Sequence, residues 1–134
     1  MTAVEFLRRF HPEGLWVLTA IKPDQGRPVT KTFTPDQADA AAAWIAARNG
    51  KANLYFMVNQ PHGPLSKKAS ATDVETVPWL HVDIDARVGE PLAAELVRIR
   101  DLVEGFAPRA TAVVNTGGGY QVFWRLAQPI RATD

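Results

Sequence analysis

The positions of apolar residues predict that strands and helices alternate along the chain. Runs of β-branched and aromatic residues predict strands at Leu15–Ile21, Val29–Phe33, Asn53–Asn59, Trp79–Ala86, Thr111–Asn115 and Tyr120–Leu126. Apolar residues at helical spacing predict helices from Thr34-Pro35 to Asn49-Gly50 and at Gly89–Phe106, and Val4–Phe10 is a short amphipathic segment. Residues 22–26 have turn chemistry and residues 60–76 have the composition of a loop. This order predicts one α+β domain over residues 1–134, with a mixed or antiparallel sheet covered by helices.

Both predicted helices carry an apolar face. Thr34 is a suitable N-cap, and Pro35 suits the first helical position. The apolar residues at helical spacing in this helix are Ala38, Ala41, Ala42 and Ile45. Those of the later helix are Leu92, Leu96, Ile99, Val103 and Phe106. We expect both faces to pack against the sheet.

The composition is that of an ordinary soluble globular protein, with 134 residues, 46% apolar and 22% charged. No run of eighteen apolar residues is present, so no membrane partner is expected. The absence of Cys excludes disulfides, thiolate zinc sites and cysteine nucleophiles, and favours a cytoplasmic location. The formal net charge is +1, but nine basic and five acidic residues lie in 1–70, against six and nine in 71–134. The two halves therefore carry net charges of +4 and −3.

The strand over residues 79–86 places two carboxylates on one face. Alternation puts Leu80, Val82 and Ile84 on a face that we expect to be buried. His81, Asp83 and Asp85 share the other face, where the two aspartates are about 7 Å apart along the strand. Because like charges at that spacing repel, a divalent cation such as Mg²⁺ or Mn²⁺ would stabilise the pair. An exposed sheet face, or pairing with arginines, would also explain the aspartates, and His81 is open to roles as ligand, phosphate contact or half-buried structural residue.

A glycine-rich turn joins the last two predicted strands. Gly117, Gly118 and Gly119 permit positive φ and close approach of a phosphate or another backbone. In the strand that follows, Gln121 and Arg125 share one face with Phe123, while Tyr120 lies on the other face with Trp124. The motif fits a nucleotide-binding turn or a simple Gly-rich hairpin.

Three segments in this order resemble signatures of one protein superfamily. The segments are Lys67-Lys68-Ala69-Ser70 with Asp73-Val74, then Leu80–Asp85, then Asn115–Trp124. They resemble the archaeo-eukaryotic primase superfamily, and most closely its RepB-like primase or primase-polymerase branch of plasmid and phage replication proteins. The resemblance covers about residues 50–126.

The resemblance implies a nucleotidyltransferase of DNA replication with an RRM-like catalytic core. Asp83 and Asp85 would bind catalytic Mg²⁺ or Mn²⁺. The nucleotide-binding residues implied are Gly117, Gly118, Gly119, Tyr120, Gln121, Arg125, Lys67 and Lys68. The implied partners are nucleoside triphosphates, a single-stranded DNA template and a helicase domain in the full-length protein.

The chain departs from this superfamily at two points. Gln121 stands where the second motif generally has a histidine, and Gln cannot carry a positive charge. The third motif, a further carboxylate on a later strand, has no counterpart before Asp134, so we expect a fragment of a longer protein with an incomplete C-terminus.

Two other functions fit parts of the pattern. An RRM-like sheet displaying Tyr55, Phe123 or Trp124 would bind nucleic acid by base stacking without chemistry. A metal-dependent nuclease would also use paired aspartates. Arg87 is an additional candidate for steering template or nucleotide.

Overall fold

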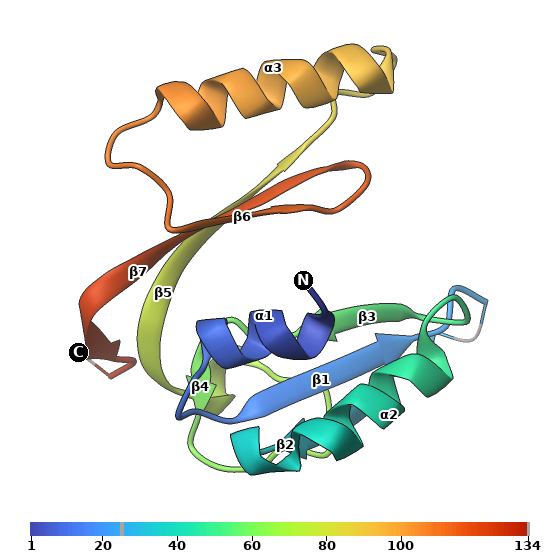
Figure 1. The fold of residues 1–134 in the computed structure, drawn as a ribbon, viewed down its shortest axis with the longest axis vertical. Helices are drawn as coiled ribbons and strands as arrows, with labels where there is room; N and C mark the ends of the chain where they lie inside the picture. The colour runs from blue at the N-terminus through green and yellow to red at the C-terminus, as the bar shows by residue number, and fades with distance from the viewer. Residues whose placement is uncertain (25, 134) are drawn as a thin grey trace. The chain divides into compact units, whose positions relative to one another are not determined.

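The computed structural model describes residues 1–24 and 26–133, which form two compact units (Figure 1). One unit contains Met1–Val77 with residues 131–133, and the other contains Pro78–Ile130. Helices combine with antiparallel strands, which confirms the predicted α+β class. Gln25, in the predicted turn over residues 22–26, and Asp134 lie outside the described residues.

The elements follow the predicted order with several additions. The first unit contains α1 (Ala3–Phe10), β1 (Trp16–Ile21), β2 (Val29–Phe33), η1 (Pro35–Gln37), α2 (Ala38–Arg48), β3 (Asn53–Phe56), β4 (Gln60–Pro61) and η2 (Ala71–Asp73). The second contains α3 (Leu92–Gly105) and β6 (Ala112–Asn115). Two strands contribute residues to both units: β5 (Val74–Asp85) and β7 (Gly119–Arg131).

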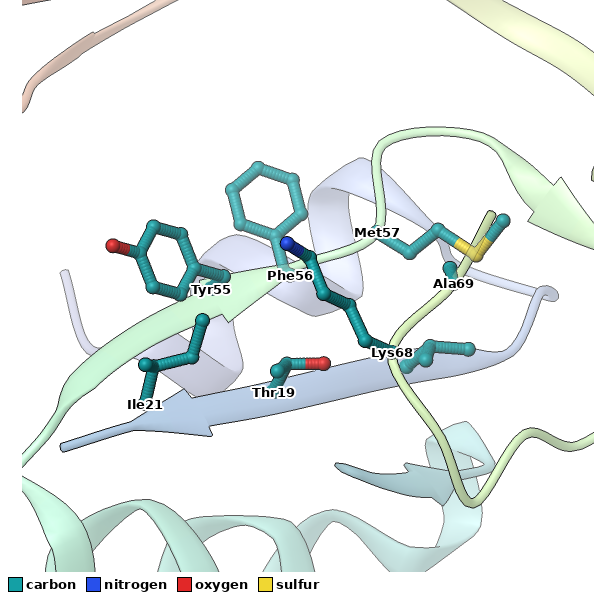
Figure 2. Close-up of a pocket in the computed structure, with 8 residues that line it drawn as sticks. Thr19, Ile21, Tyr55, Phe56, Met57, Lys68 and Ala69 are labelled. Atoms are coloured by element: carbon teal, nitrogen blue, oxygen red, sulfur yellow. The ribbon is translucent and has the colours of Figure 1, made fainter. Parts of the chain in front are cut away.

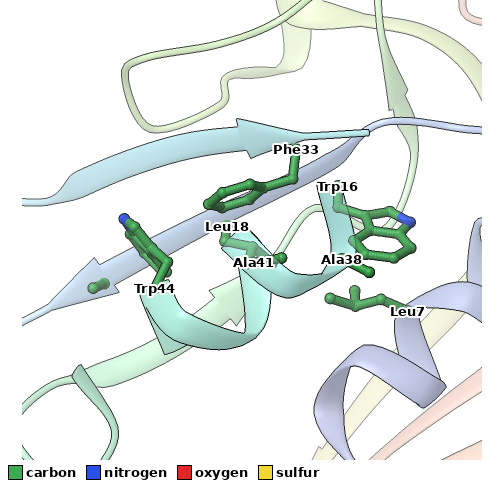
Figure 3. Close-up of a cluster of buried hydrophobic side chains, with 8 residues drawn as sticks. Leu7, Trp16, Leu18, Phe33, Ala38, Ala41 and Trp44 are labelled. Atoms are coloured by element: carbon green, nitrogen blue, oxygen red, sulfur yellow. The ribbon is translucent and has the colours of Figure 1, made fainter. Parts of the chain in front are cut away.

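A three-stranded sheet in the order β2-β1-β3 organises the first unit. Both pairings are antiparallel, with Trp16 opposite Phe33 and Thr19 opposite Tyr55. Alternate residues of β1 face α1 and α2 and form the core. The buried core residues are Leu7, Trp16, Leu18, Ala20, Phe33, Ala38, Ala41 and Trp44 (Figure 3). Ala42 is exposed, and Trp44 supplies the large buried side chain of α2 in its place.

The capping predicted at Thr34 is present. The Thr34 N–H donates to the Gln37 side chain over 3.0 Å, and Pro35 begins the short helical turn before α2. α1 has the same device, because Glu5 N–H donates to Thr2 Oγ1 and Thr2 N–H donates to the Glu5 carboxylate. These caps fix the start of α1, which the sequence did not predict as a helix, and the start of the predicted helix at Thr34-Pro35.

The opposite face of this sheet is held by hydroxyl groups. The Thr19 and Thr30 hydroxyls lie 2.8 Å apart on neighbouring strands. Thr32 Oγ1 donates to Leu65 O over 2.7 Å and accepts from Leu65 N over 2.8 Å. The two bonds between Thr32 and Leu65 tie the segment between β4 and η2 to the sheet face that the helices leave uncovered.

The predicted boundaries need correction around the loop and at the last strand. β5 begins at Val74, β4 and η2 lie within the predicted loop, and β3 ends at Phe56 rather than Asn59. β7 continues to Arg131, five residues past the predicted end at Leu126. Backbone pairing extends these strands beyond their apolar runs, since Ala132 N–H donates to Glu75 O over 2.9 Å.

A buried carboxylate fixes α3 in the second unit. Glu95 is 2% exposed and receives hydrogen bonds from Arg87 and Arg98, each over 2.8 Å at the closest. The Arg87 backbone N–H also donates to it over 2.8 Å. These hydrogen bonds hold the pKa of the Glu95 carboxyl well below its usual range. Of the predicted apolar face of α3 only Ile99 is buried, while Leu92 and Phe106 are exposed.

Glu95→Gln is expected to lower the stability of the fold at neutral pH, because it removes the charge that two guanidinium groups share. A depressed pKa stabilises the folded state above the unfolded value near 4.5 and ceases to do so as the pH falls toward the folded value. The gap in free energy of unfolding between wild type and variant should therefore be full at pH 7 and shrink below about pH 4.5. Urea unfolding at pH 7, 5, 4 and 3 measures this gap. A gap independent of pH would contradict the assignment.

Candidate functional site

The pairing of β5 with β7 determines which predicted site residues share a face. Ala86 N–H donates to Gly118 O over 2.9 Å, and Gly119 packs against the β5 backbone at Ile84–Asp85. The His81 ring stacks on Phe123, with centroids 5.9 Å apart. All three contacts fit one antiparallel register, because the residue numbers of each pair (86 and 118, 85 and 119, 81 and 123) add to 204. The register is therefore continuous over this part of the strands.

The register gathers the predicted carboxylates and part of the glycine turn on one sheet face. Asp85 lies opposite Gly119, and Asp83 lies opposite Gln121. Both aspartates are exposed, and within the described residues neither takes part in a salt bridge. In the described part of the chain, no group of three or more His, Cys, Asp or Glu side chains is placed to hold a metal ion. The pair thus offers two carboxylate ligands toward solvent.

The three glycines have three different structural roles. Gly117 has a φ of +91°, which only Gly adopts easily, and its N–H donates to Asn115 Oδ1 over 2.8 Å. Gly118 has open space where a Cβ would be. Gly119 is buried, and a Cβ there would lie 2.8 Å from Asp85 Cα and closer still to Ile84 O. Close approach of another backbone is therefore the reason for Gly119, and the Gly117 amide is already used within the turn.

The remaining residues of the turn motif separate across the sheet. Arg125 lies on the same face as Asp83, but its guanidinium sits 5.6 Å from the Trp79 ring centroid. Four residues of strand separate its row from that of Asp83, roughly 13 Å. Tyr120, half-buried, lies on the opposite face. Gln121 is consequently the polar side chain of this motif nearest to the carboxylates in register.

The two lysines belong to the first unit. Lys67 and Lys68 are exposed and lie between β4 and η2. Hydrogen bonds from Ser70 lower the pKa of the Asp73 carboxyl, with a smaller contribution from the Lys67 charge. Lys68 lines a pocket on the first sheet. The two neighbours therefore face different surroundings.

The prediction of a buried face on β5 is wrong for two of its three residues. Leu80 is 51% exposed and Val82 is 42% exposed, while Ile84 is half-buried. Strand alternation separates the two faces correctly but does not determine which one is covered. His81 is exposed rather than half-buried, and its ring lies flat against Phe123.

The aromatic residues proposed for base stacking differ in availability. Phe123 is completely buried, so it cannot stack on a base. Trp124 is half-buried, packs edge-on against Phe106 and donates its indole N–H to Pro108 O over 2.9 Å. Tyr55 is 53% exposed and is the one of the three that is open to a ligand.

The sequence did not reveal Glu95 as a buried residue or its bond to Arg87. Glu95 falls on the apolar side of α3, one residue before Leu96, and only the two arginines at suitable spacing could have indicated a buried ion pair. Arg87 is bound to Glu95 through both its backbone and its guanidinium. It holds the end of β5 to α3, and its guanidinium pairs with Glu95 while the side chain is 61% exposed.

Comparison with known protein families, with curated proteins and with solved structures finds no match to this chain. No helix in the described part of the chain is both long and apolar enough to cross a bilayer.

Substitution of the three glycines by alanine should give three different results. Gly119→Ala should destabilise by about 3 kcal/mol or more, because the new methyl group meets backbone that cannot yield easily. Gly117→Ala should cost about 1–2 kcal/mol because of its positive φ. Gly118→Ala, the matched control, should change stability by less than about 0.5 kcal/mol. Equal free energies of unfolding for the Gly118 and Gly119 variants would refute the β5–β7 register.

Proposed function

We propose that this chain is part of a DNA replication primase or primase-polymerase that catalyses template-directed nucleotidyl transfer with Mg²⁺ or Mn²⁺. The observation that carries the proposal is the shared, exposed position of Asp83 and Asp85 beside the glycine turn that leads to Gln121. The likeness of these segments to the signatures of the RepB-like branch supports it. So does their order along the chain.

The carboxylate pair fits a divalent ion by its chemistry. Two oxygen ligands on alternate positions of one strand suit a hard cation, and neither carboxylate has a salt-bridge partner in the described part of the chain. Since no third acidic or imidazole side chain joins them there, water and phosphate oxygens would complete the coordination. A bound ion would offset phosphate charge and favour ionisation of the attacking hydroxyl.

The proposal gives each of these side chains a role. Asp83 and Asp85 bind the ions that neutralise the triphosphate. Gln121, opposite Asp83, donates an amide hydrogen bond to a phosphate oxygen, a neutral substitute for the histidine usual in the superfamily. The substrates would be nucleoside triphosphates and a single-stranded DNA template, and a helicase domain would belong to the longer protein. A plasmid or phage origin and a cytoplasmic location complete the proposal.

Nucleotide binding should depend on the metal and on both aspartates. In calorimetry, a nucleoside triphosphate should bind in the presence of Mn²⁺, and Asp83→Asn or Asp85→Asn should weaken binding by more than about tenfold, as expected for a lost metal ligand. Asn preserves the size of the side chain, removes its charge and replaces one of its two oxygen ligands by an NH₂ group. Asp101→Asn, an exposed change on α3, is the matched control and should bind as the wild type does.

Two outcomes would contradict the proposal. If Mn²⁺-dependent binding were equal in the wild type and both variants, the aspartates would not be its ligands. If the chain instead cleaved labelled DNA in Mn²⁺, with cleavage lost in both variants and no nucleotide incorporated, the nuclease function would replace it.

A further inference from the structure

A pocket of about 340 Å³ lies on the face of the first sheet that α1 and α2 leave uncovered (Figure 2). Its residues come from β1, from β3 and the residue after it, and from the segment before η2: Val17, Thr19, Ile21, Tyr55, Phe56, Met57, Lys68 and Ala69. All of them belong to the first unit, whereas Asp83 and Asp85 belong to the second. The pocket is thus a separate feature from the carboxylate pair.

The floor of this pocket offers a ligand few polar groups that need a hydrogen-bond partner. Val17 and Thr19 are buried, and the Thr19 hydroxyl is already paired with that of Thr30 over 2.8 Å. A ligand that entered would meet apolar surface without leaving a buried polar group unsatisfied. Such a floor can pack against the flat face of a ring, and it does not distinguish one ring from another by hydrogen bonds to the ring edges.

Two side chains give the pocket its selectivity. Tyr55 offers an aromatic ring that is 53% exposed. Lys68 extends from its segment toward the strands (Figure 2) and is the one charged residue among those that line the pocket in the described chain. Within the described residues its ammonium makes no salt bridge. An aromatic platform beside a cation with no salt bridge in the described chain is complementary to a nucleotide unit, which has a planar neutral base and a phosphodiester with a single negative charge.

We infer that this pocket holds one nucleotide of a single DNA strand, with its base stacked on Tyr55 and its phosphate at Lys68. A phosphodiester carries one negative charge, which one ammonium matches. A free triphosphate carries several charges and would need more cations than the pocket offers. The choice of DNA rests on the proposed function, and the pocket adds the place in the first unit at which the strand is held.

The experiment measures binding of a fluorescently labelled oligothymidylate by anisotropy, with chelator present so that no divalent ion contributes. Tyr55→Ala should weaken binding by about tenfold, the effect of losing one stacked base. Tyr55→Phe, which retains the ring, should bind as the wild type does. Lys68→Gln should reduce the slope of log affinity against log salt concentration by about 0.7, the value for one lost phosphate contact on a single strand.

A control variant separates the pocket from general charge effects. Arg9→Gln makes the same charge change on α1, which packs on the other face of the sheet, and should leave the slope unchanged. Equal affinity of the Tyr55→Ala variant and the wild type would overturn the inference. The inference would also be overturned if free thymidine monophosphate bound as tightly as the strand and lost the same affinity in the Tyr55→Ala variant. The pocket would then be a mononucleotide site.

The failure of this inference is distinguishable from that of the proposed function. Tyr55→Ala should retain the Mn²⁺-dependent nucleotide binding of the wild type, because Tyr55 lines the pocket and does not belong to the carboxylate pair. Strand binding that is lost in Asp83→Asn and retained in Tyr55→Ala would place the strand at the carboxylates and overturn the inference alone.

Discussion

The close contact between the backbone at Gly119 and the end of β5 is the constraint on which the candidate site depends. A side chain at this position would meet Ile84 O, so the two strands approach as they do only because residue 119 has none. That contact fixes the register, and the register places Asp83 opposite Gln121. A shift of one residue would move every side chain of β7 to the other face and remove Gln121 from the carboxylates.

A second set of bonds, between Glu95 and the arginines Arg87 and Arg98, holds the chain just after Asp85. β5 ends at Asp85, Ala86 bonds to the glycine turn, and Arg87 bonds to Glu95 on α3. Two consecutive residues directly after Asp85 are therefore held by two different parts of the second unit, the glycine turn and α3. A carboxylate that must meet a metal ion gains from such anchoring, because a ligand on a fixed backbone loses little freedom when it binds.

The sequence was sufficient to predict the α+β class, the order of the main strands and helices, and the alternation that puts Asp83 with Asp85 on one face of their strand and Gln121 with Arg125 on one face of theirs. The pairing that brings these two faces together came from the structure. These features depend on local spacing and alternation, which the sequence displays directly. It was insufficient for burial, since alternation divides Leu80 from His81 without indicating which side is covered. It also missed Glu95, because a buried ion pair depends on two arginines that only the tertiary fold brings together. The weak β4 and the extension of β7 to Arg131 arise from backbone pairing and leave no apolar signal.

The carboxylate pair and the pocket at Tyr55 differ in charge, so ligand binding at the first should depend on a metal ion and ligand binding at the second should not. Asp83 and Asp85 repel phosphates when no cation is bound, so any nucleotide at that pair must arrive with its ion or after it. The pocket at Tyr55 presents an ammonium and an aromatic ring, so the strand that we infer there would need no ion. Because Lys68 is the one lysine among the described residues that line the pocket, stacking rather than charge would supply most of the affinity of the inferred strand. A chain with both features would hold its template in the absence of metal and recruit nucleotides only in its presence.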